Sequence, residues 1–131
     1  MSRFPNPLPI PLEQAIAQSE ITTQLIKEGK YKECVPLCEM VIPVFEAAQD
    51  WEKYIRSLND WGKCLWKTGQ LKSKSDEIET TLNEALLYLG AFHPETARSY
   101  TNLGIVHVAN NKFDMALECH EKSLQINLDL F

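Results

Sequence analysis

Apolar residues recur along residues 12–131 at steps of three and four, which is the spacing of one face of an α-helix. Turn-forming residues, mostly glycine and asparagine, separate the periodic stretches. No stretch alternates apolar and polar residues with a period of two, so the pattern predicts no strand. The predicted fold class is therefore all-α, with six helices within residues 12–29, 30–49, 50–70, 71–90, 91–111 and 112–131.

Local signals place several helix ends. Asp50 is suited to cap the start of the third helix, and Gly69 to follow its end. The polar run after Leu71 predicts that the fourth helix begins late, and Pro43 predicts a kink in the second helix. Residues 1–11 hold four of the seven prolines and are predicted to form an extended, proline-rich N-terminal arm.

Equivalent residues return at two constant spacings. Thr22, Gly62 and Gly104 stand 40 and 42 residues apart. Two further sets share these spacings: Gly29, Gly69 and Asn111, and Tyr31, Leu71 and Phe113. Fixed spacing at several positions indicates an internal repeat. The chain is thus expected to be three helical hairpins stacked as a superhelical solenoid, in units of about residues 12–49, 50–90 and 91–131.

The repeat also explains a glycine inside a predicted helix. Glycine costs about 1 kcal/mol relative to alanine in a helix interior, so Gly104 needs a compensating role. In a stacked hairpin the two helices cross closely, and a side chain at the crossing would separate them. We expect Gly104 to lie at such a crossing, with Gly62 in the equivalent place one unit earlier.

The third unit carries a family resemblance. The run "YTNLGIVH" followed by "KFDMALECH" resembles the tetratricopeptide repeat, with its pattern W-x2-L-G-x2-Y and a later A-x3-F. The signature positions are Leu103, Gly104, Phe113 and Ala116 in unit three, Gly62 and Gly69 in unit two, and Gly29 and Tyr31 in unit one. The 42-residue spacing and "GAFHPETA" look like the longer kinesin-light-chain type of this repeat.

The resemblance implies a concave face lined by the first helix of each hairpin. The predicted partner-binding residues are Arg56, Asn59, Lys63, Lys67, Arg98 and Asn102, with Ser19, Thr23 and Lys27 from the first unit. The cations would suit an acidic or C-terminal peptide, and the asparagines its backbone. The alternative is that these lysines and arginines only solvate exposed helices. The family's chaperone-tail clamp is not expected, because Ser19, Thr23 and Asp60 stand at its lysine and asparagine positions.

Composition and motifs limit the functions that the chain is expected to have. A net charge of −5 gives no expectation of nucleic-acid binding. No apolar run approaches the ~18 residues of a membrane span, and cysteines without a paired motif favour free thiols in the cytoplasm. No catalytic or cofactor motif is present, so we expect neither an enzyme nor a cofactor. Zinc binding by His107, Cys119 and His120 is disfavoured, because adjacent residues of a helix point to different faces.

The last predicted helix ends in an apolar edge formed by Leu124, Leu128 and Phe131. Either the chain is one domain of a longer repeat protein or this edge mediates self-association. The sequence therefore predicts a protein-binding scaffold. The alternatives are a self-assembly module and a regulatory or sensor domain of a larger bacterial enzyme or effector.

Overall fold

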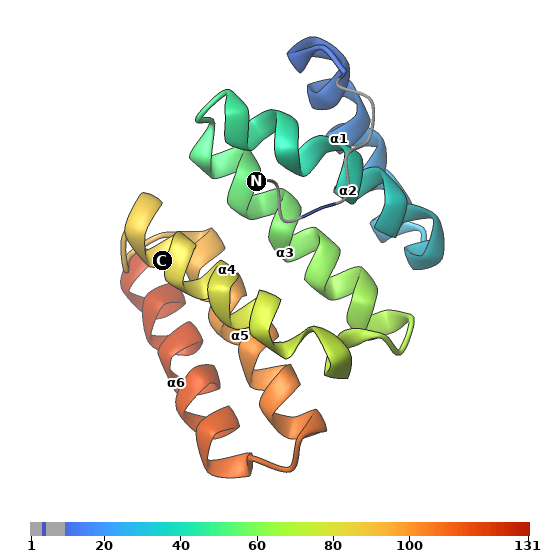
Figure 1. Ribbon diagram of the computed structural model, residues 1–131. Helices are drawn as coiled ribbons and strands as arrows, with labels where there is room; N and C mark the ends of the chain where they lie inside the picture. The colour runs from blue at the N-terminus through green and yellow to red at the C-terminus, as the bar shows by residue number, and fades with distance from the viewer. Residues whose placement is uncertain (1–3, 5–9) are drawn as a thin grey trace. The chain divides into compact units, whose positions relative to one another are not determined.

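The computed structural model describes Phe4 and residues 10–131, and these residues form six α-helices and one short 3-10 turn (Figure 1). The elements are α1 (Leu12–Lys27), α2 (Tyr31–Ala47), α3 (Trp51–Lys67), η1 (Leu71–Lys74), α4 (Ser75–Tyr88), α5 (Pro94–Ala109) and α6 (Phe113–Leu130). The all-α prediction is confirmed. Most of the predicted arm at residues 1–11 lies outside the described residues.

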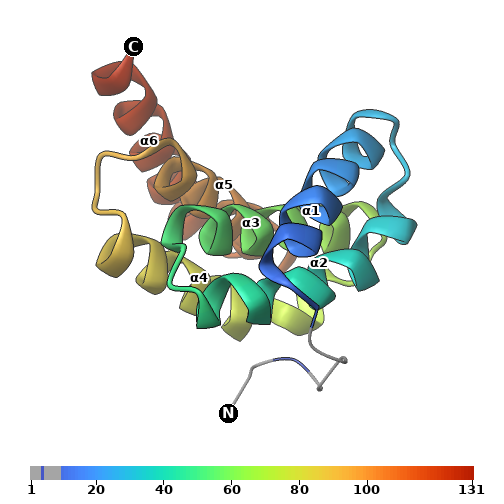
Figure 2. The ribbon, with the colours of Figure 1, turned by 90° about the horizontal axis from the view of Figure 1, so that it is seen from above.

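The helices divide into two compact units, residues 1–68 and residues 69–131. In the first unit, α2 packs against both α1 and α3; in the second, α5 packs against both α4 and α6 (Figures 1 and 2). The division falls within the predicted second hairpin at residues 50–90. The packing of that hairpin, and the three-unit stack, therefore stay predictions.

Residues that share a repeat position adopt the same backbone conformation. Gly29 and Gly69 have φ of 76° and 77°, and Asn111 has φ of 61°. This left-handed region favours glycine and tolerates asparagine. Each of the three residues follows the end of a helix, where the left-handed conformation turns the chain. The 40- and 42-residue spacing thus marks one recurring turn.

The predicted helix ends are largely confirmed. The Asp50 carboxylate accepts a hydrogen bond from the Lys53 backbone N–H at 3.2 Å and caps α3. The fourth helix begins late, because η1 occupies Leu71–Lys74 before α4 starts at Ser75. Pro43 and Pro36 both lie inside α2, and the kink at Pro43 stays a prediction.

The core of the first unit combines small and large side chains. Ala15, Cys34 and Phe45 are each 0% exposed. Phe4 is also buried and meets Trp61 edge-on, with ring centroids 5.1 Å apart. The Trp61 indole N–H donates to the Glu39 carboxylate at 3.0 Å, so this ring has both an aromatic and a polar partner.

Gly104 lies at the predicted close crossing. A Cβ atom built on Gly104 would lie 2.7 Å from Cε1 and 2.8 Å from Nε2 of His120 on α6. The obstacle is therefore an imidazole ring and not a helix backbone. Gly62 is buried on α3, but its predicted crossing with α4 concerns two different units and stays a prediction.

Replacing Gly104 by leucine should lower the free energy of unfolding by about 1–3 kcal/mol, because the side chain overpacks the α5–α6 contact. Urea denaturation measures the loss. Truncating the ring in Gly104→Leu/His120→Ala should recover part of it. Equal losses in the single and double variants would show that the ring is not the obstacle.

Replacing Asp50 by alanine should cost about 1 kcal/mol of stability, because α3 loses its N-terminal cap. Asp50→Asn is the matched control, since asparagine keeps a side-chain acceptor for the Lys53 N–H. Thermal melting should place Asp50→Asn between the unmodified chain and Asp50→Ala. An alanine variant as stable as the unmodified chain would contradict a stabilising cap.

Candidate functional site

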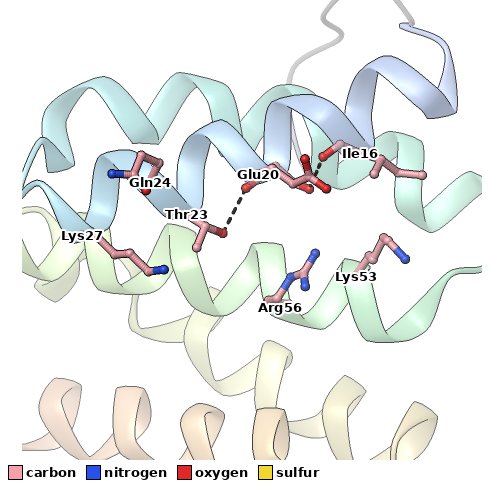
Figure 3. A pocket seen from close by; sticks show the side chains of 8 residues that line it. Ile16, Glu20, Thr23, Gln24, Lys27, Lys53 and Arg56 are labelled. Atoms are coloured by element: carbon pink, nitrogen blue, oxygen red, sulfur yellow. Dashed lines mark hydrogen bonds between the residues drawn. The ribbon is translucent and has the colours of Figure 1, made fainter.

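A groove of about 370 Å³ lies between α1 and α3 in the first unit. Both helices pack on α2 and also touch each other, so their neighbouring faces form its walls. The lining residues are Ile16, Ser19, Glu20, Thr23, Gln24 and Lys27 of α1, and Lys53 and Arg56 of α3. Figure 3 shows Lys53 and Arg56 extending from α3 toward the residues of α1.

The groove carries more positive than negative charge. Lys27, Lys53 and Arg56 face a single carboxylate, that of Glu20. The Lys53 ammonium already lies 3.1 Å from the Asp50 carboxylate that caps its own helix. Within the described part of the chain, Lys27 and Arg56 have no such ion-pair partner. These two cations are therefore available to an incoming anion.

The hydroxyl groups of the α1 wall are bonded within their own helix. The Ser19 hydroxyl donates to the Ile16 carbonyl at 2.7 Å, and the Thr23 hydroxyl to the Ser19 carbonyl at 3.1 Å (Figure 3). Each donor is thus used, and the hydroxyl oxygen keeps its capacity to accept. The α1 wall therefore contributes hydroxyl oxygens that can accept hydrogen bonds. The positive charge of the groove comes from its lysine and arginine side chains.

The groove brings together part of the predicted inner face. Ser19, Thr23 and Lys27 of α1 line the groove together with Arg56 of α3; their role in binding a partner stays a prediction. Lys53 was missed, although it lies one turn before Arg56 on the same face of α3. That spacing from Arg56 was the signal that could have identified it.

Other predicted contacts lie elsewhere. Lys63 is half-buried on α3, outside the lining of the groove. The Lys67 ammonium lies 4.0 Å from the centre of the Trp66 ring and 5.8 Å from that of Tyr31. Such cation–π contacts occupy Lys67 within the chain.

The two asparagines need correction as partner contacts. Asn59 is 0% exposed and Asn102 is 9% exposed, and both have polar partners within the chain. A buried amide in use inside the fold is not accessible to a peptide backbone. The helical pattern alone does not separate an exposed flank of α3 or α5 from a packed one.

Arg98 belongs to the second unit, where its guanidinium bonds the Glu95 carboxylate at 3.1 Å. This i,i+3 pair offsets part of the arginine's charge. The prediction that Arg98 lies beside Arg56 concerns residues of two units and stays a prediction.

A second groove, of about 510 Å³, lies between α4, α5 and α6. Leu82, Leu103 and Met115 contribute apolar surface, while Lys112 and Lys122 are balanced by Glu79 and Glu118. The positive and negative charges of this groove cancel, so it favours neither an acidic nor a basic partner. His107 and Cys119 line it as well, but no group of three or more potential ligands suited to a metal ion occurs in the described residues.

The cysteines are free and buried. The Cys34 thiol donates to the Lys30 carbonyl at 3.3 Å and lies 3.7 Å from the Thr22 carbonyl of α1. Burial raises the pKa of Cys34 to about 12. A hydrogen bond to Cys64, together with burial, raises the pKa of Cys38, and the same bond lowers the pKa of Cys64. These three thiols of α2 and α3 therefore form one buried cluster.

Buried thiols should react slowly with a thiol reagent, since the attacking species is an accessible thiolate. With 5,5′-dithiobis(2-nitrobenzoate) near pH 8, we expect less than one rapidly titrating thiol per folded chain. Added guanidinium chloride should release all four. Rapid titration of two or more thiols in the folded chain would contradict the buried cluster.

No helix in the described residues is long and apolar enough to cross a bilayer. Residues 74–129 match the family model described as tetratricopeptide repeat. That range covers α4, α5 and all of α6 but its last residue, and it includes the signature residues Leu103, Gly104 and Ala116. No curated protein matches the chain. Tetratricopeptide repeats are in general protein–protein interaction modules, and no enzyme family was detected.

Proposed function

We propose that this chain is a protein-interaction scaffold in which the α1–α3 groove binds an acidic peptide segment of a partner. The observation that carries the proposal is the excess of cations in the groove, where Lys27 and Arg56 have no counter-ion among the residues that the structure describes. Arginine can hold a carboxylate through two parallel hydrogen bonds. The repeat match at residues 74–129 supports a protein partner in general.

The groove favours a peptide over a small ligand. Its polar walls lie on two helices that run past each other, and its single carboxylate, Glu20, lies among the cations. An extended acidic segment can place several carboxylates along such a surface. Exposed charges of this kind increase encounter rate and selectivity more than final affinity, so binding should weaken as salt screens them.

Two finer assignments accompany this proposal. The 42-residue spacing and the His93–Pro94 turn support the kinesin-light-chain type of repeat; His93 caps α5 by accepting from the Glu95 backbone N–H at 3.0 Å. The four free cysteines support a cytoplasmic location, where thiols are kept reduced.

Charge reversal in Lys27→Glu/Arg56→Glu should weaken binding of a fluorescein-labelled Glu–Ser peptide of about ten residues by about tenfold or more. Fluorescence anisotropy at low salt measures the dissociation constant. The control Lys32→Glu/Lys72→Glu makes the same change in net charge at exposed positions outside the groove. It should change the constant by no more than about twofold.

Glu20→Gln provides the opposite test. Removing the one carboxylate should tighten binding of the Glu–Ser peptide and leave a Gln–Ser peptide unbound. Equal weakening by both double variants would mean that only net charge matters. That result, or no binding by the unmodified chain, would overturn the proposal.

A further inference from the structure

Helix α6 has two apolar faces, and only one of them is packed. Ala116, Cys119, Ser123 and Ile126 are buried. A second row is 58–95% exposed and follows helical spacing along the whole element: Phe113, Leu117, Leu124, Leu128 and Phe131. We call this row the α6 stripe. The row has one wider step, from Leu117 to Leu124, where no large apolar residue lies between its members. A large exposed apolar surface on a monomer marks an interaction site.

The repeat shows which kind of element fits the stripe. Two repeat steps before Phe113, Leu117 and Leu124, the corresponding residues of α2 are Tyr31, Val35 and Ile42. Ile42 is 2% exposed, whereas Leu124 is 59% exposed. Helix α2 has helical neighbours on two sides, α1 and α3, while α6 packs against α5 among the described elements. In α2, whose neighbours are helices, this register is buried at Ile42 and half-buried at Tyr31 and Val35. The α6 stripe is therefore suited to a helix.

The charged residues beside the α6 stripe indicate which charge a helix bound to the stripe should carry. Four exposed carboxylates of α6 lie along one flank of the stripe: Asp114, Glu118, Glu121 and Asp129. Lys122 is the only cationic residue within Phe113–Leu130. At 100° per residue, this flank lies beside the apolar row over most of the helix. A helix lying on the stripe would place one of its own flanks against these carboxylates.

A second copy of the chain fits less well. In an antiparallel α6–α6 pair, like flanks lie together, so the carboxylate rows would face each other and repel. The exposed side of α1 offers no better match, because it carries Glu13, Glu20 and Glu28 against Lys27. Charge complementarity thus favours a different partner.

We propose that the α6 stripe binds an amphipathic helix of a partner protein, with apolar residues at i, i+3/i+4 and i+7 and a row of lysine or arginine beside them. The apolar row supplies most of the affinity, and the carboxylates set the sign of the partner's charge. This surface goes beyond the acidic-peptide groove and does not depend on it.

Two synthetic helical peptides of about 18 residues test the proposal by isothermal titration calorimetry. Both carry the same leucine row, flanked by lysine in one and by glutamate in the other. The lysine peptide should bind at least about tenfold more tightly than the glutamate peptide at low salt. Equal affinities would overturn the charge assignment.

Variants locate the site. Leu124→Asp/Leu128→Asp should abolish binding of the lysine peptide. Leu87→Asp/Phe92→Asp makes the same change at two exposed apolar residues outside α6 and should leave binding unchanged. Glu118→Lys/Glu121→Lys should invert the peptide preference, which distinguishes a defined flank from general stickiness. Circular dichroism confirms that each variant stays folded.

Three results would overturn the inference. The first is lysine-peptide binding that survives Leu124→Asp/Leu128→Asp. The second is an unchanged peptide preference in Glu118→Lys/Glu121→Lys. The third is a dimer in sedimentation velocity of the chain alone that Leu124→Asp/Leu128→Asp converts to monomer, because the occupant would then be a second copy. Lys27→Glu/Arg56→Glu should leave lysine-peptide binding intact, so failure of the groove proposal remains distinguishable.

Discussion

The first unit depends on the burial of α2 between two helices. Cys34, Cys38 and Phe45 of α2 are each 0% exposed, and large-to-small changes at such positions cost about 2–5 kcal/mol. Covering α2 with α1 and α3 brings those two helices together as well. The groove between them is a consequence of core packing, and its cations can change without loss of a buried contact.

The charges of the groove and of the α6 flank therefore contribute little to folding. Surface ion pairs contribute about 0–1 kcal/mol to stability, and Lys27 and Arg56 have no such pair within the described residues. Lys67 differs, because its ammonium lies close to the Trp66 and Tyr31 rings. Lys67 would have to give up its contact with the Trp66 ring to bind a partner. Arg56 has no ion pair to give up within the described residues. This separates Arg56 from Lys67, although both lie on α3.

The sequence predicted those features that depend only on residues close together along the chain, such as helix caps, helix starts and turns. The Asp50 cap, the late start of α4 and the turns at Gly29, Gly69 and Asn111 are local properties, and each is found in the structure. Burial of Asn59 and the gathering of Cys64 with Cys34 and Cys38 depend on which helix packs on which face. Spacing identifies a face but not what covers it. For the same reason Gly104 was placed at a crossing, while His120 as its neighbour was not predicted.

Net charge is a poor guide to what this chain binds. The total of −5 would suggest a uniformly acidic surface, yet the groove presents three cations and one carboxylate. Charges act over about 8–10 Å at physiological salt, so a partner responds to the side chains it touches. An acidic peptide would be attracted to Lys27 and Arg56 and repelled by Glu118 and Glu121, and a basic helix the reverse. On the two proposals made above, local charge of opposite sign would give one small all-helical chain two surfaces that do not compete for the same partner.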